Sequence, residues 1–282
     1  MITDTGARPL AGRHALITGA TRGIGRQTAL AYARAGAALT LCARTRRDLD
    51  LLADELRAGG TQVRIVVADL ARREDVDALA RAATDVDIVV NNAAAKARFA
   101  SVLGADDAHW DEHIAVNLMA PLKLLRVIGA AMAERGRGVI ITFSSSAAIQ
   151  PVPFIGAYAV TKRATEYLTR LAAMELGPRG VRAVCLAPGL TVTETVQHLF
   201  ESGQAASWTS NTPLGRVAQS QEMAGLIVWL ASDAAAYLTG TTVVVDGGNT
   251  TGQYHLLAAS AGALSADDPC ARLPGAGGNR NT

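Results

Sequence analysis

Seven short apolar segments recur along the chain, and a stretch with helical periodicity follows most of them. The segments lie at 14–19, 38–43, 63–70, 86–93, 138–145, 181–189 and 241–248. Each is apolar on both faces, which is typical of strands buried in a parallel sheet. Helical patterns fall between them at 23–36, 46–58, 72–84, 107–134, 157–177 and 219–231. The alternation predicts an α/β fold, a doubly wound three-layer sandwich around a seven-stranded parallel sheet.

One domain accounts for most of the chain. No shift in composition and no internal repeat divides residues 1–248, so we expect a single folding unit there. Hydrophobic residues make up 49% of the chain and aromatic residues 4%, which requires an aliphatic core. Two segments stand outside the alternation: residues 194–212 interrupt it, and residues 249–282 form a tail rich in Gly, Ala, Asn and Ser that we expect to be partly mobile.

Charge and segment lengths exclude several function classes. A net charge of +2 does not indicate the strongly basic surface that binds nucleic acid or an acidic membrane. No apolar run is predicted to reach the length of a bilayer, and the N-terminus lacks the pattern of a signal peptide, so we expect a cytoplasmic protein. Cys42 and Cys185 fall inside predicted strands, and no CxxC spacing indicates a metal site.

A glycine-rich turn follows the first predicted strand. The segment "TGATRGIG" at 18–25 places Gly19, Gly23 and Gly25 just before a helix. Glycine allows a tight turn and lets the backbone approach a pyrophosphate, which then meets the amide groups at the helix N-terminus. An ordinary helix start is the alternative interpretation.

The end of the second strand predicts which dinucleotide binds. An acid about 20 residues beyond the turn would bind the free 2′-hydroxyl of NAD. The sequence there reads "CARTRR", with Ala43 in place of the acid and Arg44 next to it. Guanidinium groups suit a 2′-phosphate, so NADP is favoured and NAD is the alternative. Arg22 is a second candidate for that phosphate, whereas Arg46 and Arg47 could simply be solvated at a helix start.

A tyrosine and a lysine stand one helical turn apart in "YAVTK", at Tyr158 and Lys162. The pair alone would be read as a packed tyrosine beside a solvated lysine. A cationic lysine could also favour the phenolate and lower the tyrosine pKa from about 10 toward neutrality. That would make the tyrosine an acid and base for carbonyl chemistry.

Taken together, the motifs resemble the short-chain dehydrogenase/reductase family between about Gly12 and Gly248. The resemblance rests on "TGATRGIG", "DL" at 69–70, "NNAA" at 91–94, "VNL" at 116–118, "SSS" at 144–146, "YAVTK" and "PG" at 188–189. Ala94 replaces the glycine usual in the third motif. The resemblance implies a Rossmann-type fold and cofactor contacts from Gly19, Thr21, Arg22, Gly23, Ile24, Gly25, Arg44, Asp69, Leu70, Asn92, Tyr158, Lys162, Pro188, Gly189, Thr191 and Thr193.

The resemblance also implies the catalytic residues. The family's serine precedes its tyrosine by about 13 residues, which selects Ser145, with Ser144 and Ser146 as alternatives. Tyr158 would donate a proton to a carbonyl held by Ser145, and Lys162 would contact the nicotinamide ribose. Asn117 would hold a water that returns the proton through Lys162.

Substrate and assembly are less constrained. Residues 194–212 fall where the family covers its substrate, and the apolar side chains there and nearby predict a hydrophobic ketone, ring alcohol or acyl thioester: Val196, Leu199, Phe200, Trp208, Phe99 and Phe154. Alternatives are an NAD-dependent alcohol dehydrogenase, a 3-oxoacyl-thioester reductase and a non-catalytic dinucleotide-binding regulator. Family analogy implies dimers or tetramers formed through 107–134 and 157–177.

Overall fold

Seven parallel strands form one sheet in the computed structural model, which describes residues 8–194 and 209–252. Their order is β3-β2-β1-β4-β5-β6-β9, so the sheet grows outward in both directions from β1 and β4. The strands are β1 (His14–Thr18), β2 (Ala38–Ala43), β3 (Val63–Val67), β4 (Ile88–Asn91), β5 (Gly138–Phe143), β6 (Val181–Pro188) and β9 (Thr242–Val245). The predicted doubly wound α/β fold with a seven-stranded parallel sheet is confirmed.

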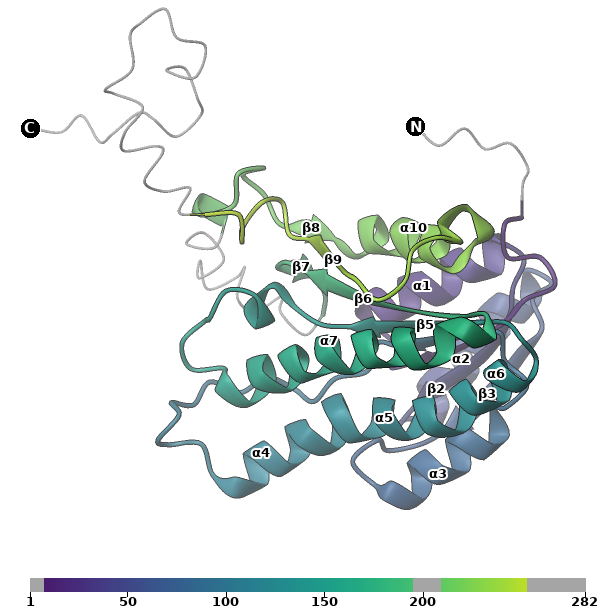
Figure 1. Cartoon of the computed structure of the whole chain (residues 1–282), viewed down its shortest axis with the longest axis horizontal. Coiled ribbons are helices and arrows are strands. Elements are labelled where there is room, and N and C mark those ends of the chain that lie inside the picture. The colour runs from purple at the N-terminus through teal and green to yellow at the C-terminus, as the bar shows by residue number, and fades with distance from the viewer. Residues whose placement is uncertain (1–7, 195–208, 253–282) are drawn as a thin grey trace, which may run out of the picture.

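Helices cover both faces of the sheet (Figure 1). One face carries α1 (Gly23–Arg34), α2 (Arg46–Ala58) and α10 (Ser220–Ala231), and the other carries α3 (Arg73–Ala82), α7 (Gly156–Leu176) and the helix spanning 107–134. Successive side chains of a strand point to opposite faces. Ala15 and Ile17 of β1 accordingly join the core under the first set of helices, whereas Leu16 joins the core under the second.

The helix at 107–134 departs from regular α geometry in two places. It consists of α4 (Asp107–His113), a π-helical segment (Ile114–Met119), α5 (Ala120–Leu124), a second π-helical segment (Leu125–Gly129) and α6 (Ala130–Glu134). Pro121 near the start of α5 has no N–H to donate to the carbonyl of Asn117, four residues earlier. The first π-helical segment contains Asn117, which the sequence assigns to the active site, and such segments often occur at functional sites.

This long helix also corrects one expectation. By length and composition Asp107–Glu134 could cross a membrane, with a mean hydropathy of 1.5 over 18 residues. The prediction that no segment reaches that length is wrong by this measure, because the helix is rich in aliphatic residues. A core helix passes the same test, and this one packs against α3 and α7.

Smaller elements connect the main strands and helices. A parallel pair, β7 (Thr191–Val192) and β8 (Ala218–Gln219), follows β6 and was not predicted. Three 3₁₀ turns span Ser146–Ala148, Gly177–Arg179 and Asp233–Ala235. Most of the predicted substrate-covering segment, including Val196, Leu199, Phe200 and Trp208, lies outside the described residues, as does most of the predicted tail.

Candidate active site

The glycine turn has the backbone that the sequence predicts. Gly19 has φ +64° and Gly23 has φ +53°, a region that disfavours residues with a Cβ. A Cβ on Gly25 would lie 2.2 Å from the carbonyl oxygen of Gly19, so no other residue fits without moving the backbone. The turn therefore brings β1 close to the first turn of α1 and leaves room for a ligand to approach the chain.

Asn92 holds this turn in place from the next strand. Its Nδ2 donates to the carbonyl oxygens of Thr18 (2.9 Å) and Gly19 (3.1 Å). In return, the Oγ1 of Thr18 accepts from the backbone N–H groups of Asn92 and Ala93, both at 3.1 Å. These bonds divert the chain after Asn91, which explains why β4 ends two residues before its predicted end.

The N-terminus of α1 already binds an anionic oxygen. The backbone N–H of Gly23 donates to Glu194 Oε2 at 2.9 Å. This carboxylate stands in for the kind of group that a helix N-terminus attracts, because free N–H groups and the helix dipole both favour negative charge. The same amide is the one expected to meet a pyrophosphate.

Four arginines are candidates for the phosphate: Arg22 in the turn, and Arg44, Arg46 and Arg47 after β2. Arg47 is exposed at the start of α2, and the other three differ in their partners. Arg46 donates through Nε to both carboxylate oxygens of Asp50, at 3.0 and 2.9 Å. Arg22 and Arg44 are exposed and form no ion pair with a described residue. Arg22 and Arg44 therefore remain available for a phosphate, whereas Arg46 serves its own helix.

The residues after β3 lie at the same edge of the sheet. The backbone N–H of Ala71 donates to Asp69 Oδ1 at 3.1 Å, which shapes the turn, and the side chain of Leu70 is buried. They occupy the position where the resemblance places an adenine contact.

Tyr158 and Lys162 lie on α7 beside the end of β5. Lys162 is buried, its Nζ donates to the carbonyl oxygen of Phe143 at 2.7 Å, and it lies 5.8 Å from the centroid of the Tyr158 ring. Burial lowers the pKa of Lys162 to about 8. Burial also raises the pKa of Tyr158, and a hydrogen bond with Ser145 opposes that rise. The predicted lowering of the tyrosine pKa toward neutrality is therefore wrong for this structure, because desolvation of the phenolate is the larger effect.

The structure separates the three serines after β5. Ser144 is buried and donates to Glu166 Oε1 at 2.6 Å, so its hydroxyl faces away from the tyrosine and is committed to α7. Ser145 lies close enough to Tyr158 to oppose the rise of its pKa, and its Oγ accepts from the N–H of Ala147 at 3.2 Å. Ser146 begins a 3₁₀ turn. Ser145 is the serine that meets the tyrosine.

Asn117 is buried and fully engaged by its neighbours. Its Oδ1 accepts from the N–H of Ala95 at 2.9 Å, and its Nδ2 contacts Thr161 Oγ1 at 3.0 Å and His113 Nδ1 at 3.1 Å. Its side chain forms no hydrogen bond with Lys162 in the part of the chain that the structure describes. A water relay would therefore use its backbone carbonyl, which Pro121 leaves without the usual donor. His113 could not be identified from the sequence, because nothing local to a histidine on a helix indicates this contact.

Known proteins are similar to this chain over most of its length. Residues 19–250 match a family model described as enoyl-(acyl carrier protein) reductase. The human protein "Dehydrogenase/reductase SDR family member 4" is 34% identical over 245 residues, covering 85% of this chain and 88% of the relative. The chain belongs to the short-chain dehydrogenase/reductase family. It is therefore an oxidoreductase by family, and the suspected resemblance is confirmed.

Two further family members are similar along most of their length. Galactitol 2-dehydrogenase (L-tagatose-forming) of Cereibacter sphaeroides is 38% identical over 247 residues, covering 86% of this chain and 96% of the relative. The crystal structure of L-sorbose reductase from Gluconobacter frateurii, complexed with NADPH and L-sorbose, has a TM-score of 0.81 and 32% identity. That match covers 86% of this chain and 98% of the other.

Departures from the short-chain dehydrogenase/reductase motifs cause little strain in the described residues. The only described non-glycine residue with positive φ is Phe154 (φ 68°), so Ala94 occupies an ordinary backbone conformation. The Cβ that strains a positive φ is therefore no obstacle there. After β6, a Cβ on Gly189 would lie 2.7 Å from the Cα of Asp246, and Thr191 Oγ1 donates to the carbonyl of Gly189 at 3.0 Å. Pro188 thus ends β6, and Gly189 and Thr193 follow it at the expected edge. A Cβ on Gly23 would lie 3.0 Å from Cγ2 of Thr193, so Thr193 lies close to the glycine turn.

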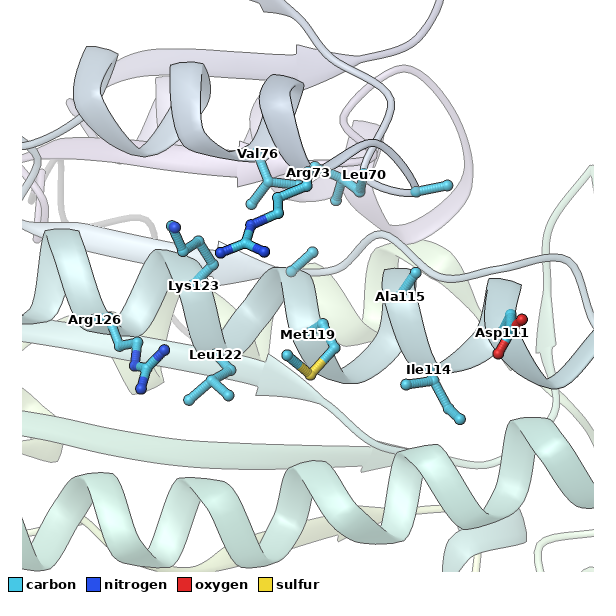
Figure 2. A pocket seen from close by; sticks show the side chains of 12 residues that line it. Leu70, Arg73, Val76, Asp111, Ile114, Ala115, Met119, Leu122, Lys123 and Arg126 are labelled. Atoms are coloured by element: carbon cyan, nitrogen blue, oxygen red, sulfur yellow. The ribbon is translucent and has the colours of Figure 1, made fainter.

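A separate groove of about 320 Å³ lies between α3 and the helix 107–134 (Figure 2). Ser145, Tyr158 and Lys162 do not line it. Apolar side chains predominate, with cationic ones among them, and the labelled residues are Leu70, Arg73, Val76, Asp111, Ile114, Ala115, Met119, Leu122, Lys123 and Arg126. Lys123 pairs with Asp77 at 2.6 Å. The groove is therefore a feature of the outer helix layer and not of the catalytic cluster.

Proposed function

We propose that this short-chain dehydrogenase/reductase uses NADP(H) to reduce a carbonyl group, or to oxidise the corresponding secondary alcohol, with Tyr158 as general acid and base. The observation that carries the proposal is the cluster of Ser145, Tyr158 and Lys162 at the end of β5. Two strands away, the glycine turn after β1 lies at the same edge of the sheet. Parallel sheets of this type bind ligands at that edge.

The residues present fit a dinucleotide. The backbone at Gly19 and Gly25 leaves no room for a Cβ, and the N–H of Gly23 already binds a carboxylate oxygen. When bound, NADPH supplies the hydride for the reduction. The remaining contacts would come from Thr21, Arg22, Ile24, Arg44, Asp69, Leu70, Asn92, Tyr158, Lys162, Pro188, Gly189, Thr191 and Thr193.

Side chains of this protein would donate a proton to the substrate oxygen and recover it from solvent. The hydroxyls of Ser145 and Tyr158 would hold the substrate oxygen, and Tyr158 would donate its proton to that oxygen. Near neutrality the raised pKa keeps the phenol protonated, as an acid requires. Lys162, with a pKa of about 8, can lose and regain a proton close to neutral pH. A water at the backbone carbonyl of Asn117 would complete the relay to solvent.

NADP is the proposed cofactor because no acid stands at Ala43 and Arg44 is unpaired among the described residues. The NADPH complex of L-sorbose reductase supports this choice. An NAD-dependent alcohol dehydrogenase is the alternative. Fluorescence titration distinguishes them: NADPH is expected to bind more tightly than NADH, and tighter NADH binding would overturn the cofactor proposal.

Three substrate classes are candidates. The first is a hydrophobic ketone or alcohol, supported by Phe99 and Phe154, which are 62% and 59% exposed. The two phenylalanines lie on two loops that are joined by a hydrogen bond of 2.8 Å from the N–H of Ala100 to the carbonyl of Phe154. The second is a polyhydroxylated ketone, favoured by the similarity to galactitol 2-dehydrogenase (L-tagatose-forming) and to L-sorbose reductase. A 3-oxoacyl-thioester reductase is a further alternative, favoured by the description of the matching family model.

One screen tests these alternatives together. NADPH oxidation is followed at 340 nm with 2-tetralone, ethyl 3-oxobutanoate, an N-acetylcysteamine thioester of 3-oxobutanoate and L-sorbose. Reduction of any of them by the wild type, abolished in Tyr158→Phe with unchanged NADPH binding, supports the proposed function. Activity retained in Tyr158→Phe would rule out the tyrosine as the acid, and NADPH binding without turnover of any carbonyl would favour a non-catalytic regulator.

Assembly and location are part of the proposal. We expect residues 1–248 to act as one catalytic domain in a cytoplasmic dimer or tetramer, with residues 194–212 covering the substrate. Exposed apolar side chains on the helix 107–134 and on α7 support pairing of these helices with those of a second copy: Ile114, Met119, Val160, Tyr167, Leu171 and Met174. Sedimentation of the purified chain measures its oligomeric state directly.

A further inference from the structure

His113 is a buried histidine close to the catalytic cluster. It lies four residues before Asn117 on the same helix and has no exposed surface. Its ring meets the Tyr158 ring edge-on, with centroids 6.1 Å apart, and the His109 ring at 4.7 Å. Neither the family motifs nor the proposed mechanism uses it.

The hydrogen bonds around Asn117 determine which nitrogen of His113 carries the proton. The backbone N–H of Ala95 can only donate, so the Asn117 atom 2.9 Å away must be the acceptor Oδ1. The Nδ2 of Asn117 then faces His113 Nδ1 at 3.1 Å and Thr161 Oγ1 at 3.0 Å. An amide nitrogen only donates, so His113 Nδ1 must accept and the ring proton must lie on Nε2.

That arrangement leaves His113 Nε2 without a partner. It is one of the buried side-chain atoms that lack a hydrogen bond among the described residues. An unpaired buried donor costs about 1–3 kcal/mol. A leucine would fill such a position without that cost, so the property that distinguishes histidine here is the acceptor at Nδ1.

We propose that His113 is a positioning residue for the proton relay of the proposed reductase. Its Nδ1 holds the Asn117 amide, which in turn holds the loop after β4 at Ala95 and α7 at Thr161. Thr161 precedes Lys162 directly, so the contact links the π-helical segment to the helix that carries the tyrosine and lysine. The inference rests on the proposed function, because the relay is part of it.

The surroundings keep His113 neutral, as an acceptor must be. Burial lowers its pKa to about 4, mainly by desolvation. His109 on the same helix, Arg98 after β4 and Lys162 on α7 lower it further, whereas Glu112 opposes them. Arg98 Nε donates to His109 Nδ1 at 3.2 Å, which also holds that second ring in place. The Asn117 contact should therefore persist throughout the neutral range and fail only in acid.

Three substitutions separate positioning from packing. Asparagine at 113 places an acceptor near the position of Nδ1, glutamine places its amide near Nε2, and leucine supplies no acceptor. With the ketone that the wild type reduces fastest, we expect kcat to fall about tenfold or more in His113→Leu and His113→Gln, as small misplacements of catalytic groups do. His113→Asn should retain most of kcat, and all three should keep the wild-type Kd for NADPH. Equal losses of kcat in the asparagine and leucine variants would overturn the proposal.

Nitrogen-15 NMR of histidine-labelled protein provides a readout that needs no turnover. The signals absent from His113→Asn identify His113, and we expect the neutral Nε2–H tautomer between pH 8 and pH 5. An Nδ1–H tautomer or a charged ring at pH 7 would overturn the inference. If Tyr158→Phe is inactive but His113→Leu has wild-type kcat, this inference alone fails. If the wild type reduces no ketone, the proposed function fails and the tautomer still decides whether His113 accepts from Asn117.

Discussion

Lys162 Nζ donates a 2.7 Å hydrogen bond to the carbonyl oxygen of Phe143, the last residue of β5. The lysine thereby joins the tyrosine helix to the strand whose following residues include Ser145. This single contact places the ammonium group next to the phenol ring while removing it from water. The ionisation of Lys162 should therefore be visible in the stability of the whole fold as well as in its chemistry.

Lys162 should make stability rise with pH in a window set by its own pKa. Burial lowers that pKa from 10.5 to about 8, so between these pH values the lysine binds more protons in the unfolded chain than in the folded chain. Burial raises the pKa of Cys42 and Cys185 to about 12, which acts in the opposite direction above about pH 9. Urea unfolding at several pH values measures the sum, and the free energy of unfolding of the wild type minus that of Lys162→Met should increase from pH 8 to pH 10. Parallel pH dependences for the two proteins would contradict the assignment.

Ser145 and Ser144 should differ in what their removal changes. Ser145→Ala loses the hydroxyl that contacts Tyr158, and kcat should fall about 10²-fold with NADPH affinity retained. Ser144→Ala instead leaves the buried Glu166 carboxylate short of one donor. It should therefore lower the free energy of unfolding by about 1–3 kcal/mol, seen as a lower urea midpoint. Kinetics and unfolding of both variants check this. A larger kcat loss in Ser144→Ala would select that serine instead.

Arg44 should determine the preference for NADPH over NADH. Losing a charged hydrogen bond to the 2′-phosphate costs about 1.5–3 kcal/mol, so Arg44→Ala should weaken NADPH binding at least tenfold and leave NADH binding unchanged. Arg46→Ala is the matched control, because Arg46 is held by Asp50. Titration of both variants with both dinucleotides measures the ratio. An equal effect of the two substitutions on NADPH binding would contradict a specific role of Arg44 in binding the 2′-phosphate.

Glu194 should oppose dinucleotide binding. Its carboxylate accepts from the Gly23 N–H, where a phosphate oxygen is expected. Glu194→Gln removes the negative charge and should lower the Kd for NADPH several-fold, most clearly at low salt, where charges are least screened. Glu134→Gln, at the end of α6, controls for net charge. Weaker NADPH binding in Glu194→Gln would show that the carboxylate assists the cofactor.

The sheet and the glycine turn could be predicted because both depend on local patterns. Seven apolar runs separated by helical periodicity specify the parallel sheet. Gly25 is required because a Cβ there would collide with the carbonyl oxygen of Gly19 within the same short turn. The family motifs likewise identified Tyr158 and Lys162 from their spacing.

Features that depend on distant neighbours could not be predicted. The direction of the Tyr158 pKa follows from burial, which no spacing in "YAVTK" reveals. The role of Ser144 depends on Glu166, more than twenty residues later on another element. The contact of His113 with Asn117 depends on the orientation of the Asn117 amide, which the N–H of Ala95 fixes from a different loop.

The two π-helical segments at Ile114–Met119 and Leu125–Gly129 have a consequence for protein engineering. A π turn holds about one residue more than an α turn, so positions three apart no longer share a face across it, whereas His113 and Asn117, four apart, still meet. Hydrocarbon staples or designed charge pairs at i, i+3 across the first segment would join different sides of the helix. Deleting one residue from that segment would favour a regular α-helix and move Asn117 relative to its present partners. Length, and not only residue identity, is thus a constraint on this helix.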